Sequence, residues 1–387
     1  MKAAAAAYSL SRLFSFFSGF FVTSLKSELP SFTGFAVFAA FTFAGDALKP
    51  ETIGIVPSLL LLAVIFVTVM WCAFSVVRHA ECLATLLGEP FGTLILTLAV
   101  IGIEVALIVA IMLSGDAIPT MARNTMFSVV MIVLNGLVGL CLLAGGLRHK
   151  NQTYNLQGAN AFLSVLVPLA IFALVLPRIT HSAPGGELSP LQSAFDVVMC
   201  LLLYGVFLAI QTVTHSDIFR QPDDDGHDEG HHGVVVRSMP FHIIGLFGAL
   251  LPIILLSKKL ALYVEFGIEG LGAPLALSGF IVAALVLMPE GLSALQAARD
   301  NKLQRAVNIC LGSAVATIGL TVPAVLLVSW VTGLKIELGL EPADIIMLVL
   351  TLFISLLTFG SRATNYLQGA VHLALFAAYV MMIFDLS

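Results

Sequence analysis

The runs GTLILTLAVIGIEVALIVAIML (residues 92–113) and LALSGFIVAALVLMPEGLSAL (residues 275–295) each place one glutamate, Glu104 or Glu290, inside a long apolar segment. Each run has about 20 residues, the length that a helix needs to cross the hydrocarbon core of a bilayer. A carboxylate near the middle of a bilayer is costly, and such residues mark ion or proton pathways. Two of them in similar contexts, far apart in sequence, predict one site built from two halves.

The rest of the chain has the composition of a membrane protein. It is 59% hydrophobic and 11% charged, with a mean hydropathy of +1.03. Apolar runs of about 20 residues recur along it, whereas a transmembrane barrel shows alternating segments of about 10 residues. The net charge is −5 without a basic patch, which argues against nucleic acid as a partner. We predict an all-α membrane protein whose partners are small cations and the lipid bilayer, and leave a homo-oligomer open.

The apolar runs predict about eleven transmembrane helices. They divide the chain into a cytoplasmic or interfacial segment (1–29), a leading helix (30–47), a first five-helix repeat (52–213), a linker (214–238) and a second five-helix repeat (239–387). The spans are expected at 30–47, 53–76, 92–114, 125–146, 160–180, 192–213, 241–263, 271–297, 306–332, 343–360 and 364–386.

Lysine and arginine are unequally divided between the two sides of this arrangement. Twelve of the 18 fall on the side of the N-terminus and the linker, and six on the other. The positive-inside rule then places the N-terminus and the linker in the cytoplasm and the C-terminus outside. Lys258 and Lys259 fit this orientation least well. Because each half has an odd number of spans, the halves have opposite orientations.

The two glutamate segments also resemble each other. GEPFGTLILTLAVIGIE (88–104) and GAPLALSGFIVAALVLMPE (272–290) both begin with Gly-x-Pro and end in the buried glutamate, 16 and 18 residues later. Inverted repeats with the binding site at their interface are a transporter architecture. The likeness is faint, and coincidence is the alternative explanation for it.

The glutamates suit an exchange of cations for protons. Removal from water favours the neutral form of a carboxyl group, and a cation beside it favours the ionised form. Each glutamate therefore holds a proton or shares a cation. Two carboxylates can neutralise one divalent ion, but Ca²⁺ takes about 6–8 oxygen ligands, so other groups must complete its shell.

Hydroxyl and backbone groups near the glutamates are candidates for the missing ligands. Thr97 lies two turns before Glu104, and Ser293 lies three residues after Glu290, so each shares a face with its glutamate. Thr93 and Ser278 are further candidates to line the ion site. Pro289 removes one helical N–H and frees a carbonyl beside the acid. For the hydroxyl residues, close helix contact through a small side chain is the alternative.

Other polar residues in the apolar runs are expected to form contacts between helices. Gln368 and His372 share a face of the last span, where a proton path is the alternative to a polar contact. The same contact role is expected for four further residues: Asn135, Tyr204, Gln211 and Asn308.

The linker is rich in acidic residues and histidine. It could bind cations and regulate transport, or it could be a solvated connector. The candidate regulatory cation ligands are Asp223, Asp224, Asp225, Asp228, Glu229, His231 and His232.

Several stretches resemble the bacterial Cha-type sodium(potassium)/calcium–proton antiporters of the calcium/cation antiporter superfamily. They occur in family order, and the likeness covers nearly everything after about residue 29. The stretches are FSVVRHAECLATLLGEPFGTLILTLAVIGIEVALI, NGLVGLCLLAGG, YGVFLAIQTVTH, GFIVAALVLMPEGLSAL, RAVNICLGSAVATIGLTVP and GAVHLALFAAYVMMIF.

This resemblance implies one leading helix plus two inverted five-helix repeats, in a bacterial inner membrane with a cytoplasmic N-terminus and a periplasmic C-terminus. It also implies that Glu104 and Glu290 carry the ion and the proton. Calcium/proton exchangers have asparagine three residues before each glutamate, whereas this chain has Ile101 and Leu287. The resemblance therefore implies transport of Ca²⁺ and H⁺, with Na⁺ or K⁺ as further candidates.

Other classes of protein fit the sequence less well. GxSxG, HExxH and P-loop patterns do not occur, so we expect a transporter without a cofactor and not an enzyme. A cation channel would not need two matched glutamates. It remains an alternative, as does an antiporter restricted to Na⁺ or K⁺.

Overall fold

The computed structural model describes residues 27–88, 91–113, 119–180, 186–221, 236–361 and 363–385. The predicted segment 1–29 therefore lies almost wholly outside the described residues, and so do all seven candidate ligands of the linker. A leading helix α2 (Leu29–Ala44) is followed by the turns η1 (Gly45–Leu48) and α3 (Pro50–Ile53).

The first half then contains five spans. Their segments are α4 (Ile55–Leu87), α5 (Phe91–Met112), α6–η2–α7 (Met121–Met131, Ile132–Leu137, Val138–His149), α8–η3–α9 (Leu156–Ala170, Ile171–Val175, Leu176–Ile179) and α10–η4 (Pro190–Ala209, Ile210–Thr214). A short 3₁₀ turn, η5 (Ser216–Phe219), leads into the linker.

The second half repeats this order. Its spans are α11 (Met239–Leu271), α12 (Ala276–Arg299), α13–η6–α14 (Leu303–Ala316, Thr317–Thr321, Val322–Thr332), α15 (Pro342–Thr358) and α16 (Tyr366–Asp385). Within the described residues, ten spans are long and apolar enough to cross a membrane, and α15 is a shorter apolar helix. The predicted all-α membrane protein, with one leading helix and two five-helix repeats, is confirmed.

The first helices of the two repeats are longer than the sequence predicted. We expected spans at 53–76 and 241–263, but α4 and α11 each contain 33 residues. The added turns of α4 carry Arg78 and His79, which find partners in Glu28 and in His242 of α11. Gly88 and Gly272, both with positive φ, end them.

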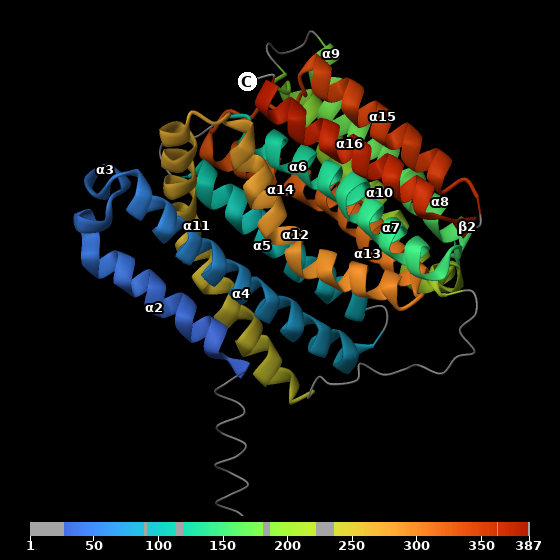
Figure 1. Ribbon diagram of the computed structural model, residues 1–387, viewed down its shortest axis with the longest axis horizontal. Helices are drawn as coiled ribbons and strands as arrows, with labels where there is room; N and C mark the ends of the chain where they lie inside the picture. The colour runs from blue at the N-terminus through green and yellow to red at the C-terminus, as the bar shows by residue number, and fades with distance from the viewer. Residues whose placement is uncertain are drawn as a thin grey trace, which may run out of the picture.

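These two helices pack side by side in opposite directions (Figure 1). A Cβ added to Gly270, near the end of α11, would lie 2.5 Å from Ile55 at the start of α4. A Cβ added to Gly245, near the start of α11, would lie 2.3 Å from His79 near the end of α4. The opposite directions of α4 and α11 agree with the inverted orientation of the two repeats.

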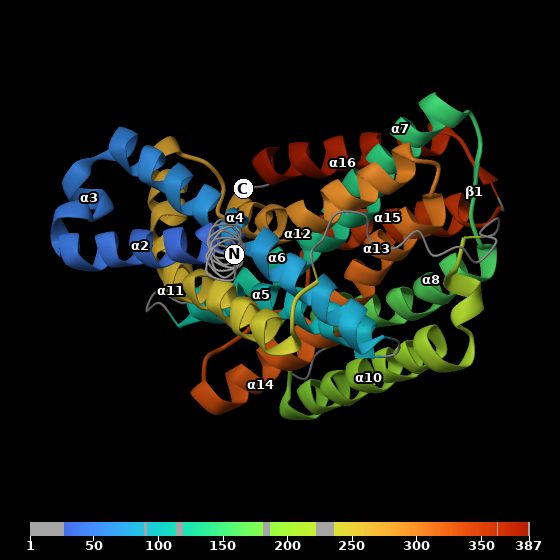
Figure 2. The same ribbon diagram turned by 90° about the horizontal axis from the view of Figure 1, so that it is seen from below.

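The third span of each half is interrupted by a π-helical segment, η2 in the first and η6 in the second. Such π segments often occur at functional sites, because the extra residue leaves part of the backbone ladder unpaired. Figure 2 shows α12 and α13 in the middle of the molecule, with α7 and α16 on one side and α10 and α14 on the other.

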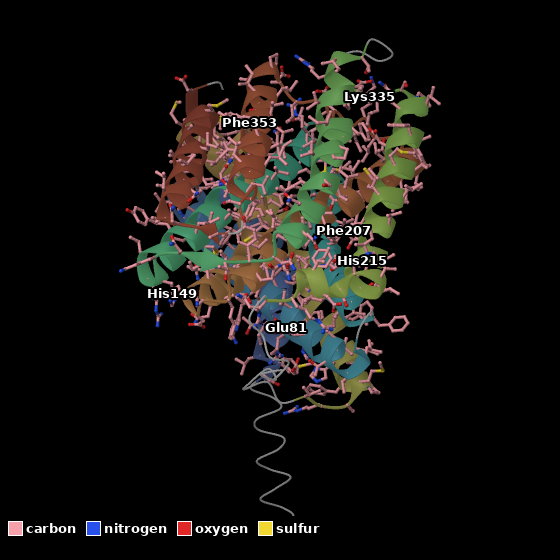
Figure 3. All side chains as sticks on the ribbon, turned by 90° about the vertical axis from the view of Figure 1, so that its right-hand side faces the viewer. Glu81, His149, Phe207, His215, Lys335 and Phe353 are labelled. Atoms are coloured by element: carbon pink, nitrogen blue, oxygen red, sulfur yellow. The ribbon has the colours of Figure 1, made fainter. Side chains whose placement is uncertain are left out.

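The two ends of the molecule can be told apart from the side chains in Figure 3. Glu81, His149 and His215 lie toward one end, and Lys335 lies at the other. Glu81, His149 and His215 end or follow the second, fourth and sixth spans, and Lys335 follows the ninth, so their distribution matches the predicted alternation of sides. The end that carries Glu81 and His215 is called the linker end below.

Candidate ion-binding site

Glu104 occupies the middle of α5 and is 1% exposed. Its Oε2 accepts a hydrogen bond of 2.9 Å from the hydroxyl of Thr317, and its Oε1 has no hydrogen-bond partner among the described residues. A buried carboxylate oxygen without a donor is costly. Oε1 of Glu104 therefore lacks the donor that a buried, ionised carboxylate needs.

Thr317 belongs to η6, the π segment of the second repeat. Thr321, four residues later, also lies close to Glu104, and its buried hydroxyl has no partner among the described residues. Threonine in an α-helix usually bonds to its own backbone. The π segment instead presents two threonine hydroxyls from one repeat to the glutamate of the other.

Glu290 lies in α12, directly after the buried Pro289. Its Oε2 is buried without a hydrogen-bond partner in the described part of the chain, and the Ser313 side chain is close to it. Glu290 is also near enough to Glu104 for the two carboxylates to repel each other when both are ionised. The two acids therefore lie in one region of the molecule, where α5 and α12 are in contact.

A cavity of about 470 Å³ leads to Glu290. Arg78 and Glu81 of α4 and Arg305 of α13 line it, and Glu81 lies toward the linker end (Figure 3). Most of its surface is apolar. The cavity gives the site a route toward the linker end.

The predicted hydroxyl residues do not all reach this cavity. Thr97 and Ser293 line it, as expected from their shared faces with the glutamates. Ser278 instead donates to the Leu275 carbonyl at 2.6 Å and borders a separate small cavity. Ser278 lies twelve residues before Glu290. This separation corresponds to a rotation of roughly 120° around the helix, which explains why the two side chains lie on different faces. The side chain of Thr93 lies outside the described residues.

Three residues assigned to helix contacts also line the cavity: Tyr204, Gln211 and Asn308. Asn308 additionally donates to the Phe219 carbonyl, so its contact role holds as well. Their positions depend on how α10 and α13 pack around the site, which sequence spacing within one helix does not reveal. Thr317, Thr321 and Ser313 were missed, although the i,i+4 threonine pair in an apolar run was a visible signal.

The last span carries the expected polar contact. His372 is buried, with Nε2 3.0 Å from the Thr358 hydroxyl and Nδ1 3.2 Å from Asn135 Oδ1. Asn135 in turn donates to Thr351. Gln368 accepts from the Asn365 backbone N–H at the start of α16 and does not join this network.

The positions that carry asparagine in calcium/proton exchangers are apolar here and close to the site. Ile101 lines the cavity and Leu287 is buried. The described residues contain no cluster of three or more His, Cys, Asp or Glu side chains suited to a resident metal. The polar groups near the glutamates are therefore hydroxyls, such as those of Thr317 and Ser313, and the amides of Gln211 and Asn308 elsewhere in the cavity wall.

The sequence matches the model for the sodium/calcium exchanger protein family over residues 57–213 and 241–384. The chain belongs to this family. The chain is 44% identical over 337 residues to the sodium-potassium/proton antiporter ChaA of Escherichia coli (strain K12), which covers 86% of this chain and 91% of the relative. It is 26% identical over 328 residues to the Ca²⁺/H⁺ antiporter ChaA of Bacillus subtilis (strain 168), with coverage of 84% and 91%.

Solved structures share the fold of this family member. Native YfkE matches with a TM-score of 0.69 at 21% identity, covering 91% of this chain and 99% of that one. The H⁺/Ca²⁺ exchanger CAX matches with a TM-score of 0.58 at 14% identity, covering 92% and 89%. At these identities the likeness concerns the fold alone.

Proposed function

We propose that the protein is a secondary antiporter that exchanges a cation for H⁺, with Glu104 and Glu290 binding the cation or protons in turn. The observation that carries this proposal is that a buried glutamate of one repeat and a half-buried glutamate of the other lie near each other, each with one buried oxygen that lacks a hydrogen-bond partner among the described residues. Release of protons makes the site negative and attracts a cation, and protonation expels the cation. Exposure of the site to each side in turn converts this competition into exchange.

The cation is Ca²⁺, with Na⁺ or K⁺ as additional substrates. Two carboxylates can balance a divalent charge, while hydroxyls such as those of Thr317 and Thr321 supply neutral oxygens. The apolar Ile101 and Leu287 remove the two amide oxygens that calcium/proton exchangers carry three residues before each glutamate, which favours weaker and less selective binding. Relatives named for sodium–potassium and for calcium exchange support the wider range. An antiporter restricted to Na⁺ or K⁺ is the second candidate, favoured by the same apolar residues.

The protein acts without a cofactor in a bacterial inner membrane, with its N-terminus and linker in the cytoplasm and its C-terminus in the periplasm. Residues 52–213 and 239–387 are the two functional repeats, and 214–238 is a candidate regulatory linker. The cavity then opens to the cytoplasm, because it leads toward the linker end.

The test uses inside-out membrane vesicles that hold a respiration-driven pH gradient reported by a dye. Addition of Ca²⁺, Na⁺ or K⁺ should release protons from the vesicles, and vesicles with Glu104→Gln should not respond. An imposed cation gradient should also drive protons uphill, which a channel cannot do. Failure of all three cations to release protons between about pH 6 and pH 9 would overturn the proposal.

A further inference from the structure

A chain of hydrogen bonds between titratable side chains joins three helices at the linker end. His79 of α4 and His242 of α11 lie with their Nδ1 atoms 3.0 Å apart. His79 Nε2 lies 3.1 Å from Oε2 of Glu28, the residue before α2, and His242 Nε2 accepts the backbone N–H of Arg237 at 2.9 Å. Both histidines are buried, at 1% and 3% exposure.

These contacts fix where the protons are. Because His242 Nε2 accepts from the Arg237 N–H, a neutral His242 must carry its proton on Nδ1 and donate it to His79. His79 Nδ1 is then an acceptor, so its own proton is on Nε2 and is donated to Glu28. Arg78 Nη2 is also 3.1 Å from His79 Nε2, but it can only donate. It therefore donates to Glu28 Oε1 and the Ser75 hydroxyl, which lie within 3.2 Å.

In this state each of the four ring nitrogens of the pair already takes part in a hydrogen bond. One more proton on His79 Nδ1 would set two N–H groups against each other across 3.0 Å. A proton on His242 Nε2 would face the Arg237 N–H instead. The first event breaks the contact between α4 and α11, and the second breaks the contact between the end of the linker and α11. Protonation of the pair therefore costs one of these two contacts.

Charged groups from three parts of the chain surround the pair. Glu28 faces the pair from the start of α2, Arg78 from α4 and Arg237 from the segment before α11. Partial burial acts to raise the pKa of Glu28, but its hydrogen bonds with His79 and Ser27 and the positive charge of Arg78 lower it overall. One ionised carboxylate then stands beside two arginines, so an added imidazolium is the third positive charge against one negative charge.

The histidine ring cannot turn away from this conflict without moving a helix. His79 packs directly on the backbone of Gly245 in α11, where an added Cβ would lie 2.3 Å from the ring. On the same turn of α4, Arg78 and Glu81 line the cavity that leads to Glu290. A shift of α4 against α11 would therefore reshape the cavity mouth.

We propose that His79 and His242 form a proton-binding regulatory site, whose neutral form fastens α4 to α11 beside the cavity mouth and whose protonated form releases this contact and slows exchange. Histidine is the side chain whose charge changes most readily near physiological pH, so the pair can respond to acidification of the cytoplasm. Protonation increases as the pH falls, so exchange is fast at neutral and alkaline cytoplasmic pH and declines on the acid side. The effect on the exchange rate presupposes the proposed antiport activity.

The decisive variant is His242→Asn. An asparagine amide can turn either its N–H or its oxygen toward His79 Nδ1. It can therefore form a hydrogen bond with His79 in either protonation state. Cation-dependent proton release is measured in inside-out vesicles, whose outer medium sets the pH of the cytoplasmic face. We expect the acid-side decline to move to lower pH by about one unit, with the rate near pH 8 within about twofold of the original protein. His215→Asn, a change at an exposed histidine of the linker end, should follow the original profile.

A second measurement does not depend on transport. Spin labels at Leu86→Cys and Ile244→Cys, both exposed, report the distance between the linker ends of α4 and α11. The distance should change between about pH 8 and pH 5.5 in the original background and stay constant with His242→Asn. Superimposable pH profiles for original and variant, or an unchanged label distance, would overturn the regulatory site. If the label distance changes with pH but the original protein shows no exchange, the proposed function is refuted and the regulatory site is not.

Discussion

Replacement of Thr317 by valine removes one hydroxyl and almost no volume from the ion site. That hydroxyl donates to Glu104 Oε2 at 2.9 Å. A hydrogen bond to a charged group contributes about 1.5–3 kcal/mol, and one between neutral groups about 0.5–1.5 kcal/mol. The ionised, cation-binding form of Glu104 therefore loses about 1–1.5 kcal/mol more than its protonated form. Since 1.4 kcal/mol is a factor of ten, the apparent cation affinity should fall roughly tenfold.

The assay is cation-dependent proton release at several pH values. The pH for half-maximal exchange with Thr317→Val should lie about one unit above that of the original protein, because protons then compete better for the site. Thr317→Ser keeps the donor and should stay within about twofold, and so should Thr332→Val, an exposed site in the same span whose hydroxyl bonds to its own helix. An unchanged cation affinity and pH profile in Thr317→Val would refute the argument that this hydroxyl stabilises the cation-bound state.

Three further changes test the rest of the structure. Glu104→Gln and Glu290→Gln should each abolish exchange, whereas Glu269→Gln, at an exposed position of α11, should not; near-normal exchange in either site variant would remove that residue from the mechanism. Deletion of residues 223–232 should alter the cation dependence but spare basal exchange, and total loss would show that the linker is structural. Asn135→Leu removes two buried hydrogen bonds and should lower the thermal midpoint of the detergent-solubilised protein, with a cost of about 2–4 kcal/mol; an unchanged midpoint would contradict this.

The spans could be predicted because length and hydropathy are local properties of the sequence. The end of α4 could not, because the polar turns that prolong it are stabilised by partners in other parts of the chain. His79 shows why: its partners, Glu28 and His242, are 51 and 163 residues away. Hydropathy averaged over neighbouring residues registers only a polar residue after an apolar run, so the predicted span ends there.

The same contrast separates the parts of the ion site. Glu104 and Glu290 stand out because a carboxyl in an apolar run is unusual on its own. Threonine in a transmembrane helix is not unusual, so the role of Thr317 appears only when η6 is seen beside α5. Ser278 was expected at the ion site because its hydroxyl could serve as an ion ligand. It lies on another face of α12, where it donates to the Leu275 carbonyl.

The antiparallel contact of α4 with α11 also bears on how such a protein could have arisen. The two helices occupy the same place in their repeats, and each begins where the other ends. A single half inserted into a membrane in both directions would meet its own copy across a twofold axis through this contact. Duplication and fusion of that ancestral gene would yield the present chain. The two halves should then still assemble when they are produced as separate polypeptides divided within the linker.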